Sequence, residues 1–151
     1  LQDLIETAQV FRYSMWIDAS IEYITRHVLN SQTKEELRTA LKNLTILTQS
    51  DERKSARAER ALALAAAYDS PRMAKQMGNE TQRLTDSLTD IIEELKNKEL
   101  IKPTINAKTA ATFIQAYTLG KIVNDYSPTA ITETEWVDLI MDIVDHTFMQ
   151  G

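Results

Sequence analysis

Residues 70–99 read SPRMAKQMGNETQRLTDSLTDIIEELKNKE, and this stretch decides the fold class. Its apolar side chains and one threonine recur every three or four residues, which is the repeat of one helical face. Ser70 stands at an N-cap, and Pro71 occupies the first turn, where its missing N–H costs nothing. We therefore predict an amphipathic helix that reaches about Glu99. Its buried face consists of Met73, Met77, Thr81, Leu84, Leu88, Ile91 and Leu95.

The rest of the chain shows the same helical spacing, and no stretch alternates as a half-buried strand does. Capping boxes are expected where Glu36 follows Thr33 and where Glu135 follows Thr132. Ser50 and Asn106 are further N-cap candidates. A chain of 151 residues is long enough to bury a sizeable core. We predict a single all-α domain of about six helices, which besides 71–99 cover 1–29, 33–48, 51–68, 106–126 and 132–149.

Charge and composition exclude several classes of protein. Lys and Arg number 17 against 22 Asp and Glu, so 17 − 22 gives a formal charge of −5, unlike a basic nucleic-acid-binding surface. The chain has no cysteine, which removes disulfides and thiolate chemistry and fits the cytoplasm. No apolar run approaches the roughly 18 residues that span a bilayer, so no membrane partner is expected. Because the chain begins with Leu1 inside a helical pattern, we expect it to be a fragment of a longer protein.

Catalytic and metal-binding patterns are missing from the sequence. The di-iron pattern of helical bundles needs Glu three residues before each His, but Ile24 precedes His27 and Ile143 precedes His146. The three glycines stand singly, so no glycine-rich phosphate loop is formed. We therefore expect no catalytic residue, no metal ion and no cofactor.

A basic cluster in the third expected helix has two interpretations. Arg53, Arg57 and Arg60 lie on one helical face, which could meet a phosphate group or an acidic partner. Acidic residues alternate with them, and such mixed charges usually form a solvated surface. We favour the solvated surface. The alternating acids are Asp51, Glu52 and Glu59.

The helix expected at 106–126 is apolar on nearly every side, since its only charged residues are Lys108, Lys121 and Asp125. The earlier helices can cover only one face of the hairpin that it forms with 132–149. A second copy of the chain is the simplest cover for the other face, and a glycine would let two backbones approach closely. We predict a homodimer whose interface contains Leu119, Gly120, Val123, Trp136, Ile140, Ile143 and Phe148.

A family resemblance rests on the last two helices. Residues 111–125, ATFIQAYTLGKIVND, followed by EWVDLI at 135–140 and by Phe148, resemble the C-terminal regulatory domain of TetR-type transcriptional repressors. The resemblance extends to TKEEL at 33–37, DER at 51–53 and LIKP at 100–103, and so covers essentially the whole chain. The sequence departs from many relatives at Lys98-Glu99, where they turn with a glycine.

The resemblance implies a function as well as a fold. The last two helices would form a four-helix interface with those of the partner chain. A helix-turn-helix domain missing upstream of residue 1 would contact operator DNA in the intact protein. A small, partly apolar effector would bind between the first long helix, the helix after Pro71 and 106–126, and change the affinity for DNA. We expect its pocket to be lined by Phe11, Met15, Trp16, Met77, Phe113 and Tyr117.

The alternative is a structural dimerisation or adaptor domain that binds no ligand. Large and flexible apolar side chains at helical spacing form a solid core as readily as a hollow one. Periodicity does not distinguish the two, so both interpretations stay open from the sequence.

Overall fold

The computed structural model describes residues 1–149 and 151, and its helices begin largely where the sequence supplies caps. Four N-cap side chains accept a hydrogen bond from a backbone N–H of the first turn, which satisfies one of the free donors there. The capped helices are α2 (Lys34–Gln49) by Thr33, α4 (Pro71–Asn97) by Ser70, α5 (Ala107–Gly120) by Asn106 and α7 (Glu133–Ile143) by Thr132.

The two expected capping boxes differ in the hydrogen bond that the glutamate side chain accepts from the backbone. At α7 the box is complete, because the Glu135 carboxylate accepts from the Thr132 N–H at 2.8 Å. At α2 the Glu36 carboxylate instead accepts from the N–H of Gln32 at 2.7 Å, one residue before the cap. The expected return bond to Thr33 is therefore wrong, although the Thr33 hydroxyl does accept from the Glu36 N–H.

The helix expected at 51–68 is interrupted. Its middle is α3 (Lys54–Ala66), and single turns of 3₁₀ helix, η1 (Asp51–Arg53) and η2 (Ala67–Asp69), lie on either side. Ser50 makes no side-chain cap here, because its hydroxyl bonds back to the Leu47 carbonyl. The N-cap predicted at Ser50 is therefore wrong.

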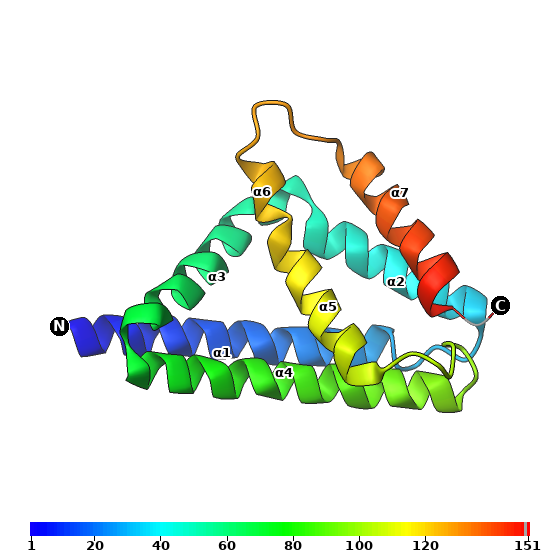
Figure 1. Ribbon diagram of the computed structural model, residues 1–151, viewed down its shortest axis with the longest axis horizontal. Coiled ribbons are helices and arrows are strands. Elements are labelled where there is room, and N and C mark those ends of the chain that lie inside the picture. The colour runs from blue at the N-terminus through cyan, green and yellow to red at the C-terminus, as the bar shows by residue number, and fades with distance from the viewer. Residues whose placement is uncertain (150) are drawn as a thin grey trace.

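The base of the molecule is a parallel pair of long helices, α1 (Gln2–His27) and α4, whose starts lie together at one end (Figure 1). Ile17 and Met73 are completely buried, and the hydroxyl groups of Tyr13 and Thr81 lie 3.0 Å apart across the pair. Burying an apolar side chain of this size stabilises a fold by about 1.5–3 kcal/mol. The amphipathic face predicted for α4 therefore packs against α1 in the core of the fold.

The remaining helices form a triangular frame on one side of this base (Figure 1). α2 runs from the end of α1 to the apex, α3 returns to the start of α1, and α5 rises from α4 to the same apex. α7 lies beside α2. The main apolar core therefore lies where α1, α2, α4, α5 and α7 converge.

The two C-terminal helices are shorter than expected. α5 ends at Gly120, and a separate turn, α6 (Ile122–Asp125), follows Lys121. α7 passes into a π-helical turn, η3 (Val144–Phe148). This turn is held in place because the Lys102 N–H donates to the Phe148 carbonyl at 2.9 Å.

The predicted all-α single domain of about six helices is confirmed, with α6 as a short continuation of α5. In residues 1–149 and 151 no strand forms, and the only strand-like pairing is a single bridge between Ile101 and Met149. None of the described helices has the length and apolarity that crossing a membrane requires.

Candidate functional site

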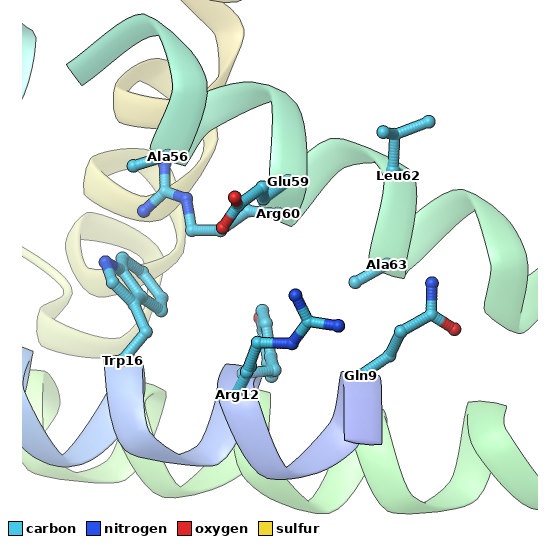
Figure 2. A pocket seen from close by; sticks show the side chains of 9 residues that line it. Gln9, Arg12, Trp16, Ala56, Glu59, Arg60, Leu62 and Ala63 are labelled. Atoms are coloured by element: carbon cyan, nitrogen blue, oxygen red, sulfur yellow. The ribbon is translucent and has the colours of Figure 1, made fainter. Parts of the chain in front are cut away.

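A cavity of about 230 Å³ lies between α1 and α3, and we call it the Arg60 cavity (Figure 2). The short side chains of Ala56 and Ala63 on α3 leave this space above α1. One wall comes from α1 with Gln9, Arg12, Tyr13 and Trp16, and the other from α3 with Ala56, Glu59, Arg60, Leu62 and Ala63.

Arg60 lies over an aromatic surface. Its guanidinium carbon is 4.0 Å from the centroid of the Trp16 ring, and the Tyr13 ring lies 5.8 Å from the same indole. A guanidinium that stacks in this way uses its face, while its N–H donors point outward in the plane of the group. The donors of Arg60 therefore stay available to a partner that approaches from the side.

Among the residues that the structure describes, Arg60 has no partner of opposite charge. Among the described residues it forms no ion pair, and its Nε atom is buried without a hydrogen-bond acceptor. Burial lowers the pKa of Arg60 to about 10, with a smaller lowering from Arg57 and an opposing effect from Tyr13. Arg60 is therefore charged at neutral pH and half-buried, and it has no charged partner among the described residues.

Two further charges line the Arg60 cavity. Arg12 points from α1 toward α3, and Glu59 lies on the opposite wall (Figure 2). In the described part of the chain neither side chain forms an ion pair. Arg12 and Arg60 against Glu59 leave one excess positive charge at the cavity.

A second, smaller cavity of about 90 Å³ lies at the centre of the fold, and we call it the apolar cavity. The Phe113 ring lies 5.4 Å from Tyr117 and 6.3 Å from Phe148, and burial raises the pKa of the Tyr117 phenol. An engineered cavity of about 150 Å³ is known to accept benzene, so the apolar cavity as it stands is too small for such a ring. Its lining includes Leu88, Ile91, Phe113, Tyr117, Ile140 and Phe148.

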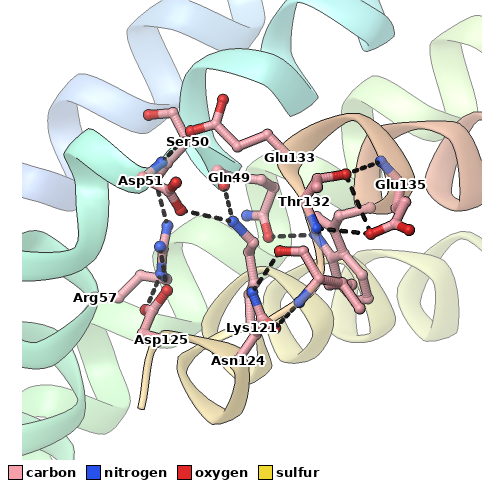
Figure 3. A network of polar contacts seen from close by, with 12 residues as sticks. Gln49, Ser50, Asp51, Arg57, Lys121, Asn124, Asp125, Thr132, Glu133 and Glu135 are labelled. Carbon is pink, nitrogen blue, oxygen red and sulfur yellow. Dashed lines mark hydrogen bonds and ion pairs between the residues drawn. The ribbon is translucent and has the colours of Figure 1, made fainter. Parts of the chain in front are cut away.

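A buried polar network joins α3 to the break between α5 and α6 (Figure 3). The Arg57 guanidinium donates to both carboxylate oxygens of Asp125, and it also donates to the Ser50 carbonyl at 3.1 Å. Pairing with Arg57 holds the pKa of Asp125 below its ordinary value. Arg57, unlike Arg60, is therefore fully paired.

The same region contains a buried lysine. Lys121 donates from Nζ to the Gln49 carbonyl, and burial lowers its pKa. The Trp136 indole N–H donates to the Gln49 side chain at 3.0 Å (Figure 3). These contacts connect the end of α2 to α5 and α7, and we interpret the network as structural because its groups satisfy one another.

The solvated surface predicted for the basic cluster is wrong for two of its three members. Arg53 is exposed, but Arg57 is 1% exposed and Arg60 is half-buried against Trp16. The neighbouring acids do not pair with these arginines. The partner of Arg57 lies 68 residues away, so local charge spacing held no signal for it.

The six residues predicted to line one pocket lie in four different environments. Phe113 and Tyr117 line the apolar cavity, which lies where the pocket was expected, while Trp16 lines the Arg60 cavity. Met77 is 2% exposed within the core and lines neither cavity. Two side chains face solvent, since Phe11 and Met15 are 64% and 56% exposed.

The residues predicted for the dimer interface differ in how exposed they are. Gly120 is exposed, a Cβ added there would meet open space, and Val123 is 80% exposed. Ile140 is only 4% exposed and belongs to the core of its own chain, whereas the neighbouring Leu139 faces outward. The remaining four are half-buried, namely Leu119, Trp136, Ile143 and Phe148.

No protein-family model, curated protein or solved structure matches this chain. Among the described residues, no group of three or more His, Asp or Glu side chains is arranged to hold a metal ion. Two features of the described residues are suited to binding, namely the Arg60 cavity and the exposed apolar residues of α5 to α7.

Proposed function

We propose that this chain is the ligand-sensing and dimerisation domain of a TetR-type transcriptional repressor. The family comes from the sequence resemblance, and the observation that carries ligand binding is the Arg60 cavity of about 230 Å³, with its unpaired arginine. Operator DNA is contacted by a helix-turn-helix domain of the intact protein. A small effector in the cavity changes the affinity of that domain for DNA.

The position of the cavity supports a regulatory role. An effector acts on DNA binding only if it binds one arrangement of the protein better than another. The cavity lies between α1 and α3, and the start of α1 lies beside the connection from α3 to α4 (Figure 1). A ligand that changes the spacing of α1 and α3 therefore shifts this end of the molecule, which is where we place the link to the DNA-binding domain.

Exposed apolar residues support dimerisation through α5 to α7. Phe113, Val123 and Leu139 are 42%, 80% and 51% exposed, and a Cβ added at Gly120 would meet open space. Exposed apolar side chains are typical of interfaces when a partner covers them, and a two-fold axis would bring these helices from two chains together.

A structural dimerisation or adaptor domain without a ligand is the second candidate. The small size of the apolar cavity favours it, because the centre of the fold is then a nearly solid core. In this alternative the protein still forms a dimer, but it does not respond to small molecules.

A thermal-shift screen with small amphipathic compounds distinguishes the two functions. A ligand at a hundred times its dissociation constant adds about 2.7 kcal/mol to the free energy of unfolding. Ala63→Leu, which fills part of the Arg60 cavity, should abolish the shift, while Ala65→Leu on the exposed side of α3 should keep it. A screen without any stabilising compound favours the adaptor, and a mass of one chain in light scattering rejects both candidates.

A further inference from the structure

We propose that the Arg60 cavity binds a small aromatic carboxylate, with the carboxylate paired to Arg60 and the ring against Tyr13 and Ala63. This inference rests on the proposed function as to regulation, and it adds the chemical class of the effector. The binding itself follows from charge, geometry and volume.

A comparison of two arginines on α3 supports an anionic ligand. Arg57 and Arg60 are one helical turn apart, Arg57 buried and Arg60 half-buried with a buried Nε, but only Arg57 has a carboxylate partner in the described chain. A buried charge without a partner is strongly unfavourable, so proteins normally pair such groups. An anion in the cavity would give Arg60 what Asp125 gives Arg57.

The geometry of Arg60 favours a carboxylate. The Arg60 guanidinium lies over the Trp16 ring (Figure 2), and the edge that carries its terminal nitrogens forms no hydrogen bond among the described residues. Two parallel N–H groups on that edge match the two oxygens of a carboxylate. Arg12 on the opposite wall offers a second positive charge, whereas Glu59 disfavours ligands with more than one negative charge.

The volume of the cavity indicates how large a ligand group it can hold. Pockets for drug-sized molecules enclose roughly 300–1,000 Å³, and a void of about 150 Å³ accepts benzene. The Arg60 cavity, at about 230 Å³, lies between these sizes and suits one ring with a short acidic substituent. Tyr13, Trp16 and Ala63 supply apolar surface for that ring.

Phenylacetate and its neutral isostere phenylacetamide test the inference by titration calorimetry on the whole chain. We expect phenylacetate to bind at least about tenfold more tightly, because a hydrogen bond to a charged group is worth about a factor of ten or more. Arg60→Gln should remove this preference, and Arg60→Lys should restore part of it by returning the charge. Arg83→Gln, at an exposed arginine paired with Asp18 and Glu80, is the matched control and should bind as the unaltered chain does.

The inference is overturned if phenylacetate does not bind at concentrations up to about 10 mM, or if the amide binds equally well. These two results need only the unaltered chain, so they hold even if Arg60→Gln does not fold. Failure here is separate from failure of the proposed function. If only neutral compounds stabilise a dimer, the aromatic carboxylate is the wrong ligand class, but the proposed regulatory function stands. If phenylacetate binds to a protein that remains a single chain, the ligand class is supported and the proposed function is wrong.

Discussion

The Arg57 guanidinium and the Asp125 carboxylate form a buried ion pair with two hydrogen bonds of 2.6 and 2.7 Å, although 68 residues separate them. Their side chains are 1% and 4% exposed. The pair connects α3 to α6 directly after the break at Lys121. It therefore helps to position the segment between the two helices that we propose as the dimer interface.

Asp125→Asn should destabilise the fold by about 3–5 kcal/mol, because it leaves the buried Arg57 charge without a partner. Urea unfolding at neutral pH measures this loss. Glu22→Gln is the control, since Glu22 pairs with Arg26 on the surface and both side chains are about two-thirds exposed. We expect the control to change stability by less than about 1 kcal/mol. If both variants lose the same free energy of unfolding, the buried pair stabilises the fold no more than the surface pair does.

The same pair should contribute to acid sensitivity. The folded pKa of Asp125 lies below its ordinary value of 3.8, with the hydrogen bond from Arg57 as the largest cause. Its contribution is therefore complete above the unfolded pKa and is lost as the pH falls through the folded one. The double variant Arg57→Met with Asp125→Leu should lose less stability than the unaltered chain between about pH 5 and pH 2. Parallel unfolding curves over that range would contradict this expectation.

Glu99→Gly should stabilise the protein by up to about 1 kcal/mol, because Glu99 adopts a left-handed backbone after α4 that a side chain disfavours. Its φ angle is 61°, and the adjacent Leu100 N–H bonds back to the Leu95 carbonyl. Thermal unfolding measures the gain. Asn97→Gly, in the last right-handed turn of α4, should bring no gain. A loss of stability in Glu99→Gly would mean that contacts of the Glu99 side chain outweigh the backbone strain.

Gly120→Arg should convert the proposed dimer to single chains, because it inserts a charge into a contact that excludes water. Light scattering at micromolar concentration measures the mass. Gly78→Arg is a matched control, since a Cβ at either glycine meets open space and Gly78 lies on α4, outside the proposed interface. A dimer that survives Gly120→Arg would place the interface elsewhere.

The sequence by itself determined the fold class and most helix starts. Ser70 with Pro71, Asn106, and the pair of Thr132 with Glu135 all act where they were expected. These signals are local, because a cap and the N–H it satisfies lie within one turn of each other. The buried face of α4 could be predicted for the same reason, since its spacing depends only on helical geometry.

Only the tertiary structure decided the roles of the arginines and the position of the cavity. Arg57 and Arg60 stand in the same local charge pattern, yet one pairs with Asp125 and the other lies unpaired over Trp16. Likewise, Phe11 and Trp16 lie on the same helix, but only Trp16 faces α3. Helical periodicity groups residues by face, but it does not specify which helix will cover that face. The crossing of α1 and α3 alone places Trp16 beneath Arg60, and this contact between segments distant in sequence creates the candidate site.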